Sequence, residues 1–467
     1  MASYSTPGVY IQEIATLPAS VAQVETAIPA FIGLTANAVV EPKRITSMVD
    51  FADVFGGPEE SIITINIIDS SGVDIVDPTV AAPASDLNLY YHMQMYFSNG
   101  GGPCYVTSCG TVTADLTEAK IKVALGKIQK EDEPTLLVIP EAVHLTAGFG
   151  NVMIAALEQC NELQDRFTIM DLEDNTGNFT TDASSFRTDV GTQYLKYGAS
   201  YYPWLNTSLQ YDDASVKVTY NGIDPTGIGA AITAGGKTLA TIIAEATDPN
   251  APDTDLANFI GEQLGAIRNK VAEQVITLSP SSSMAGVYAR VDSDRGVWKA
   301  PANVSLNGVA SPTYKINNAD QEGLNVDSTG KSINAIRTFT GKGVIVWGAR
   351  TLAGNDNEWR YVPVRRLFIT IEESVRKATE FVVFEPNDKN TWNRTRTMIE
   401  NYLTDLWRQG ALAGAKPEDA FFVNVGLGQT MTSQDILEGK LIVEVGIAAV
   451  RPAEFIILNF SHKLQEA

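Results

Sequence analysis

Residues 135–171 read TLLVIPEAVHLTAGFGNVMIAALEQCNELQDRFTIMD. Two short apolar runs, Thr135–Ile139 and Arg166–Asp171, each predict a buried strand. Between them Val152–Leu163 carries apolar residues at helical spacing, so the stretch predicts a strand, a helix and a second strand. Strands that are joined by a helix imply a largely parallel sheet with helices on its faces.

The same rhythm continues on both sides of this stretch. Further strands are expected at residues 27–35, 104–109, 198–204, 343–350 and 421–425, and further helices at 48–55, 87–97, 364–380 and 391–409. Residues 206–275 differ, because they are rich in Thr, Gly, Asp and Pro over much of their length. The predicted fold class is α/β, a mixed sheet core flanked by helices, with an inserted peripheral β-rich lobe and extended terminal strand arms.

Both ends of the chain carry apolar strips with a β pattern. The N-terminal strip follows Pro7-Gly8, and a β-rich region at 440–460 is interrupted by Arg451-Pro452. Each strip can pair within its own subunit or complete the sheet of a neighbour, and contacts of the second kind build rings or filaments. The predicted intersubunit strand residues are Val9, Tyr10, Ile11, Ile14, Phe455, Ile457, Leu458 and Phe460. The residues predicted to form a hinge, or simply a structural linker, are Ala15, Thr16, Leu17, Pro18, Ala19 and Ser20.

Composition limits the partners. A chain of 467 residues exceeds the size at which a single core keeps growing, so two or more lobes are expected. Residues 331–467 carry 17 basic and 16 acidic side chains, whereas residues 1–330 carry 17 basic and 39 acidic ones. Nucleic acid is not expected as a partner of so acidic a protein. No apolar run reaches about 18 residues, so direct membrane insertion is not expected.

Motifs of enzyme chemistry are incomplete. Gly236-Lys237-Thr238 lacks the earlier glycine of a phosphate-binding loop, and Gly148-Phe149-Gly150 and Gly426-Leu427-Gly428 lack the third glycine of a dinucleotide fingerprint, so both are expected to be turns. The three histidines lie far apart and none has a cysteine at metal-ligand spacing. The charges of Arg290–Arg295 predict a local ion-pair network. No catalytic, cofactor-binding or metal-binding residue is expected, and the chain is not expected to be an enzyme.

Several blocks along the chain resemble contractile tail sheath proteins of phages and phage-tail-like injection particles. These blocks are STPGVYIQEI (5–14), AIPAFIGLT (27–35), FADVFGG (51–57), FSNGGGPCYVTSC (97–109), MAGVYARVDSDRGVWKAPAN (284–303), GVIVWGARTL (343–352), FVVFEPNDKNTW (381–392) and VEVGIAAVRPAEFIILNF (443–460). The resemblance implies a structural subunit that stacks as hexameric rings around an inner tube and contracts from a metastable extended state. The alternative is a degenerate α/β hydrolase or nucleotide-binding domain.

The resemblance also implies a domain plan and a set of partners. The expected parts are an N-terminal arm and linker (1–28), the first part of the core (29–205), the inserted lobe (206–275), the conserved C-terminal part of the core (276–438) and a C-terminal strand arm (439–467). Asp435, Glu438 and Lys440, in a short predicted helix at 432–440, are expected at the tube attachment. The partners implied are further copies of the chain, with or without related sheath subunits, the inner tube protein, and baseplate and terminal cap proteins. Assembly is expected in the bacterial cytoplasm, as part of a phage tail or of a particle released from the cell.

Overall fold

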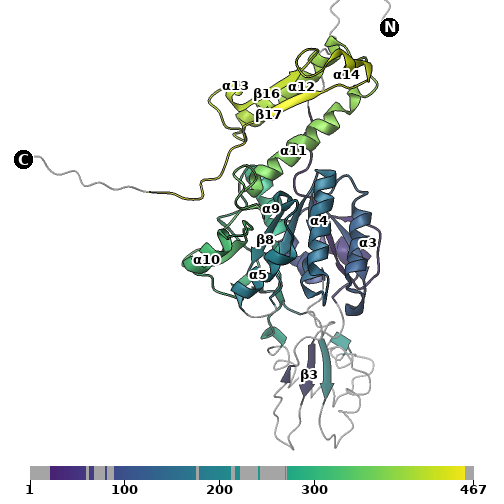
Figure 1. Cartoon of the computed structure of the whole chain (residues 1–467). Coiled ribbons are helices and arrows are strands. Elements are labelled where there is room, and N and C mark those ends of the chain that lie inside the picture. The colour runs from purple at the N-terminus through teal and green to yellow at the C-terminus, as the bar shows by residue number, and fades with distance from the viewer. Residues whose placement is uncertain are drawn as a thin grey trace, which may run out of the picture. The chain divides into compact units, whose positions relative to one another are not determined.

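The computed structural model describes residues 21–58, 63–67, 79–80, 89–174, 178–211, 216–220 and 271–457, together with positions 240, 241, 244 and 269. The chain divides into two compact units (Figure 1). The larger unit comprises Glu25–Thr370 and Arg451–Ala467, and the smaller unit comprises Met1–Val24 and Ile371–Val450. The boundaries expected at residues 206, 276 and 439 stay predictions.

A mixed sheet forms the centre of the larger unit. Its strands are β1 (Pro29–Leu34), β2 (Lys43–Ile45), β5 (Cys104–Gly110), β6 (Leu136–Val138), β7 (Phe167–Asp171), β8 (Gly198–Tyr202), β12 (Val304–Ser305), β14 (Asn334–Phe339) and β15 (Gly343–Val346). Their order is β12-β15-β14-β8-β7-β6-β1-β5-β2. The strands from β14 to β5 are parallel, whereas β2, β15 and β12 are antiparallel to their neighbours.

Helices cover both faces of this sheet, which confirms the predicted α/β fold class. They are α1 (Met48–Phe55), α2 (Leu89–Ser98), α3 (Glu118–Ile128), α4 (Phe149–Leu163), α5 (Phe179–Asp189), α9 (Ser281–Arg295) and α10 (Asn318–Asn325), with short 3-10 helices at Thr113–Asp115, Pro140–His144 and Leu195–Tyr197. Helices α3 and α4 pack together (Figure 1), and α2 packs beside α9.

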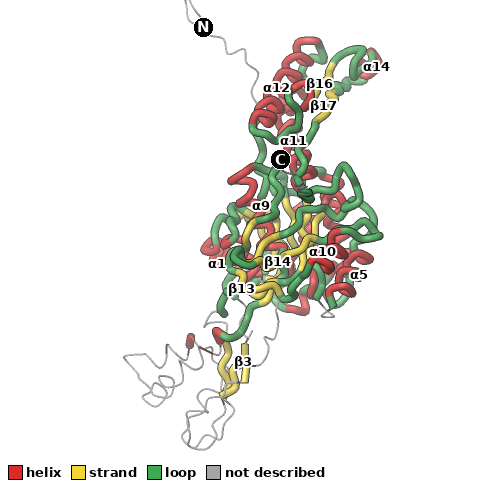
Figure 2. Tube along the Cα trace, turned by 90° about the vertical axis from the view of Figure 1, so that its left-hand side faces the viewer, coloured by secondary structure: helices red, strands yellow, loops and turns green. Residues whose placement is uncertain are grey.

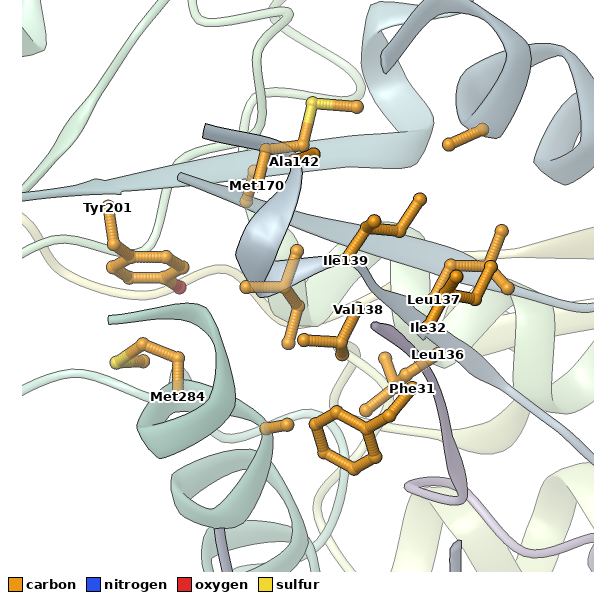
Figure 3. Packing of buried hydrophobic residues seen from close by; sticks show 14 of the residues in the cluster. Phe31, Ile32, Leu136, Leu137, Val138, Ile139, Ala142, Met170, Tyr201 and Met284 are labelled. Carbon is orange, nitrogen blue, oxygen red and sulfur yellow. The ribbon is translucent and has the colours of Figure 1, made fainter. Parts of the chain in front are cut away.

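The core lies where these helices meet the central strands. Phe31, Leu137, Met170 and Met284 are all essentially inaccessible to water, and Figure 3 shows Met284 of α9 approaching the sheet from the side of Tyr201. Burying an apolar side chain of this size contributes about 1.5–3 kcal/mol each. Strands β6 and β7 are buried along their whole length because helices cover both of their faces.

The larger unit contains two smaller sheets besides the main one. Strands β3 (Ile63–Ile67), β4 (Thr79–Val80) and β10 (Val216–Tyr220) form a sheet in the order β10-β3-β4. Strands β9 (Leu205–Thr207), β11 (Thr277–Leu278) and β13 (Val309–Pro312) form another, in which β9 and β11 are antiparallel neighbours. The residues that flank 208–276 therefore lie side by side. The pairing of β3 with β10 was not expected from the sequence.

The smaller unit is built from helices and one β-hairpin. Its elements are the second half of α11 (Val362–Thr379), a 3-10 helix at Glu380–Val382, α12 (Lys389–Arg408), α13 (Pro417–Ala420), β16 (Phe421–Val425), α14 (Ser433–Leu437) and β17 (Val443–Ile447). Asp388 caps α12 by accepting from the backbone N–H groups of Asn390 and Thr391, both at 2.9 Å. Figure 2 shows α12 beside β16 and β17, and Val423 is buried on this face.

Candidate functional site

The hairpin of β16 and β17 is a two-stranded antiparallel sheet. Five residue pairs hold its register, from Phe421 opposite Ile447 to Val425 opposite Val443. Within the described residues, neither strand has a second partner strand. A hairpin with open edges presents unpaired N–H and C=O groups, which a further strand can satisfy.

One face of this hairpin carries an exposed aromatic side chain, Phe422. The ring of Phe422 lies over Gly446, where an added Cβ would come within 2.1 Å of the ring carbon Cε1. Phe422 is half exposed, and Leu427, just after β16, is exposed to a similar degree. Glycine at position 446 therefore lets the Phe422 side chain lie across the neighbouring strand.

The predicted arm residues are only partly within the described chain. Val9, Tyr10, Ile11, Ile14, the linker Ala15–Ser20, Leu458 and Phe460 lie outside the described residues. Phe455 and Ile457 lie within them, in a segment at 451–457 without regular secondary structure, and their exposed fractions are 72% and 82%. Large exposed apolar side chains that lie close together are typical of interaction sites.

The start of the described chain is fixed at two points. In the smaller unit, the backbone N–H of Val24 donates to Ser374 Oγ at 3.1 Å. In the larger unit, the Arg366 guanidinium donates to the carbonyl oxygen of Thr26 at 2.8 Å and to both carboxylate oxygens of Asp292. Residues 24 and 26 are therefore each held by a hydrogen bond within their own unit.

Asp292 corrects one expectation from the sequence. Its partner is Arg366, 74 residues away, and not the neighbouring charges of Arg290–Arg295. Both side chains are at most 5% exposed, and the guanidinium also lies 4.6 Å from the centre of the Tyr288 ring. A buried ion pair of this kind is costly to break from one side, because the remaining charge stays desolvated.

The three residues predicted for tube attachment lie at the exposed helix α14, where all three take part in local contacts. Asp435 forms a reciprocal capping box with Thr432, and Lys440 Nζ lies 2.7 Å from Glu438 Oε2. Backbone and hydroxyl donation from Thr432 lowers the pKa of Asp435, and the bond from Lys440 lowers the pKa of Glu438. Leu437, between them, is 82% exposed.

Phe384 is a functional candidate that the sequence did not suggest. It follows α11, is fully exposed and has a backbone φ of +69°. For a residue with a Cβ this left-handed conformation costs about 1 kcal/mol, and exposure recovers none of it through burial. The same loop is joined to the end of α14, because Asn387 Nδ2 donates to the carbonyl oxygen of Lys440 at 2.9 Å. The run FVVF is typical of a buried strand, so nothing in it signals exposure.

The place where an α/β sheet of this order would bind a nucleotide is filled. Strand β1 lies between β5 and β6, and ligands usually bind outside the carboxyl ends of the strands where the order reverses in this way. Here the fully buried Glu141 accepts from the backbone N–H of Leu34 at 2.5 Å. A Cβ on Gly33 would lie 2.6 Å from the same carboxylate oxygen.

The glycine-rich fragments have structural roles. Gly148 caps α4 with a φ of +88°, and a Cβ on Gly150 would lie 2.7 Å from the carbonyl oxygen of Asp189. Gly148–Gly150 therefore begins a helix and is not the expected free turn, whereas Gly426–Gly428 does form a turn, closed by the N–H of Gly428 and the carbonyl of Met431. Lys237 lies outside the described residues. Among the residues that are described, no cluster of three metal-ligating side chains occurs, and no helix is long and apolar enough to cross a membrane.

Comparison with known proteins agrees with these observations. Residues 354–463 match the family described as the phage tail sheath C-terminal domain. A sheath complex of the extracellular contractile injection system PVC, in its contracted state, is 32% identical, with 99% of both chains covered and a TM-score of 0.66. The helical sheath of the anti-feeding prophage AFP, also contracted, is 33% identical over 99% of this chain and 100% of that one, with a TM-score of 0.64.

A curated relative is more distant. The tail sheath protein of Vibrio phage KVP40 is 22% identical over 184 residues, which are 38% of this chain and 26% of that protein. The chain thus matches about a quarter of that phage protein, but the full length of the injection-system sheath chains. By its full-length similarity to these chains, this protein belongs to the family of contractile tail sheath proteins.

Proposed function

We propose that this chain polymerises as stacked hexameric rings around an inner tube, and that the polymer contracts to drive the tube through a target cell envelope. The observation that carries the proposal is the two-stranded hairpin of β16 and β17, whose edges lack further strands among the described residues. The same chain has an exposed apolar segment at Phe455–Ile457. A molecule with an open sheet and a free strand-forming end can act as acceptor and donor at once, and such contacts propagate.

The energy for contraction comes from subunit packing. If the contracted state buries about 500 Å² more surface per subunit, half of it apolar, the gross gain is about 6 kcal/mol per subunit. Summed over many rings, this gain drives the tube without hydrolysis of a nucleotide. The filled crevice at Glu141 agrees with such a mechanism.

The partners follow from this role. Further copies of the chain bind through the arms, the tube protein binds near α14, and baseplate and terminal cap proteins close the two ends of the polymer. At α14 the exposed Leu437 supplies an apolar contact beside Asp435, Glu438 and Lys440. Assembly takes place in the bacterial cytoplasm, before the particle is released.

Negative-stain electron microscopy of the purified full-length protein tests the proposal. Stacked rings or hollow tubes are the expected result. A persistent monomer at high concentration, with and without co-expressed tube protein, would contradict it. A contraction that stops in Lys237→Ala would instead favour the nucleotide-binding alternative.

A further inference from the structure

After β17 the chain returns to the larger unit, where side chains hold it. Arg451 Nη1 donates to the carbonyl oxygen of Asn357 at 2.8 Å, and Glu454 pairs with Arg350. Beyond Glu454, Phe455, Ile456 and Ile457 have exposed fractions of 72%, 78% and 82%. Glu454 is therefore the last residue of the described segment that a side-chain contact holds.

The Glu454 carboxylate receives donors on both of its oxygens. Oε1 accepts from Arg350 Nε at 2.9 Å and from Asn325 Nδ2 at 2.9 Å. Oε2 accepts from Arg350 Nη2 at 2.7 Å and from the Tyr361 hydroxyl at 3.0 Å. Paired guanidinium donation of this kind is stronger and more directional than a single hydrogen bond.

Other hydrogen bonds hold Arg350 in place independently of Glu454. The backbone N–H of Arg350 donates to Asn334 Oδ1 at 2.7 Å, and Asn334 Nδ2 donates back to the carbonyl oxygen of Arg350 at 2.8 Å. The Arg350 side chain is only 5% exposed, and Nη1 donates to the carbonyl oxygen of Asn325 at 3.2 Å. A guanidinium this buried requires a carboxylate, and within the described residues Glu454 is the acid that pairs with it.

We propose that Arg350, Asn325 and Tyr361 form a carboxylate-binding site that fixes the C-terminal arm at Glu454, so that the free arm begins at Phe455. This inference rests on the proposed function, because a free arm has a role only if another copy of the chain binds it. The site sets the length of the tether between subunits.

The site has a mechanical consequence that follows from chain geometry. Without it, the last backbone hydrogen bond before the arm is that from Val450 N–H to the carbonyl oxygen of Ala411. Because Arg451 keeps its bond to Asn357, residues 452–454 would then join the free arm, and at about 3.3 Å per residue they would lengthen it by about 10 Å. A longer tether transmits less of one ring's displacement to the next.

A probe on the arm tests the site directly. Cys104, Cys109 and Cys160 are buried, so Ala453→Cys in the full-length protein offers one exposed thiol for a spin label, directly before Glu454. Glu454→Gln and Glu454→Asp, the second of which keeps the charge on a shorter side chain, should each raise the mobile fraction of the label about tenfold or more. The matched control is Glu444→Gln on β17, whose exposed carboxylate lies 3.4 Å from Asn424.

The experiment distinguishes failure of the carboxylate-binding site from failure of the sheath function. Label mobility in Glu454→Gln equal to that in the control would overturn the site. In assembled particles, Glu454→Gln should leave a larger fraction extended after the trigger that contracts the parent. If the arm is released but the contracted fraction is unchanged, the tether role is wrong while the sheath function stands. Failure of the unlabelled, unsubstituted protein to polymerise would overturn the sheath function itself and, with it, the tether role.

Discussion

Two buried titratable groups at the centre of the larger unit predict opposite pH dependences. His92 of α2 is 1% exposed, and its Nδ1 lies 3.2 Å from Ser282 Oγ. Asp171, at the end of β7, accepts from the Ser281 backbone N–H at 2.7 Å, from Ser279 Oγ at 2.8 Å and from the Ser281 hydroxyl. Asp171 thereby caps the first turn of α9 from a distant strand.

Burial moves both pKa values, each in the direction that disfavours charge. For His92, burial and then the nearby His144 lower the pKa from 6.5 to about 3. For Asp171, burial raises the pKa from 3.8 to about 7, against the hydrogen bonds from Ser281 and Ser279, which lower it. At neutral pH the folded protein therefore holds a neutral His92 and a partly protonated Asp171.

The signs follow from proton uptake in the unfolded chain. The unfolded chain protonates His92 first, so its contribution to the free energy of unfolding is lost as the pH falls from 6.5 towards 3, by about 3 kcal/mol at pH 4.5. Asp171 acts in the opposite direction. Its contribution is full below 3.8 and is lost as the pH rises through 7, so acidification from pH 7 to 4.5 restores about 3 kcal/mol. In the parent protein these two terms offset each other.

Single substitutions separate the contributions of His92 and Asp171 to the unfolding free energy. Relative to the parent, His92→Gln should gain about 3 kcal/mol of unfolding free energy between pH 7 and 4.5, and Asp171→Asn should lose about as much. Urea unfolding of the full-length protein, followed by circular dichroism at several pH values, measures both slopes, and the double variant should return to the parent's slope. If the unfolding free energy of both single variants depends on pH as it does in the parent, burial does not shift these two pKa values as described.

Three further predictions concern the surfaces. Deleting residues 1–14 should leave circular dichroism unchanged but abolish ordered polymers in micrographs, because the partners of this arm lie on another subunit. Leu437→Lys should weaken co-sedimentation of the subunit with the tube without lowering its melting temperature, whereas Asp435→Ala should lower the unfolding free energy, because it removes one half of the capping box with Thr432. Phe384→Gly should raise that free energy by about 1 kcal/mol, because glycine tolerates φ > 0, while reducing assembly.

Local patterns predicted the elements well. The runs at 135–139 and 166–171 became β6 and β7, and the helix expected between them is α4, which begins three residues earlier at Phe149. The short helix at Met48–Phe55 and the strand at Phe421–Val425 have the predicted bounds. These elements follow from spacing and from glycine breakers, which a single sequence displays.

Long-range pairings could not be predicted in the same way. Asp171 and Ser281 are 110 residues apart, and Arg350 and Glu454 are 104 apart, so no spacing rule connects them. The charges around Asp292 suggested neighbours as partners, because the sequence contains no trace of the fold that brings Arg366 beside it. The exposure of Phe384 likewise depends on what surrounds the loop and not on the loop's own residues.

Exchange of strands between subunits is the central claim, and cryo-electron microscopy of the assembled polymer tests it most directly. The account predicts that β16 and β17 lie in a sheet completed by strands from other copies of the chain, with Phe455–Ile457 of one copy on the hairpin of another. A polymer in which the hairpin remains two-stranded, and in which both termini fold back on their own subunit, would contradict the account.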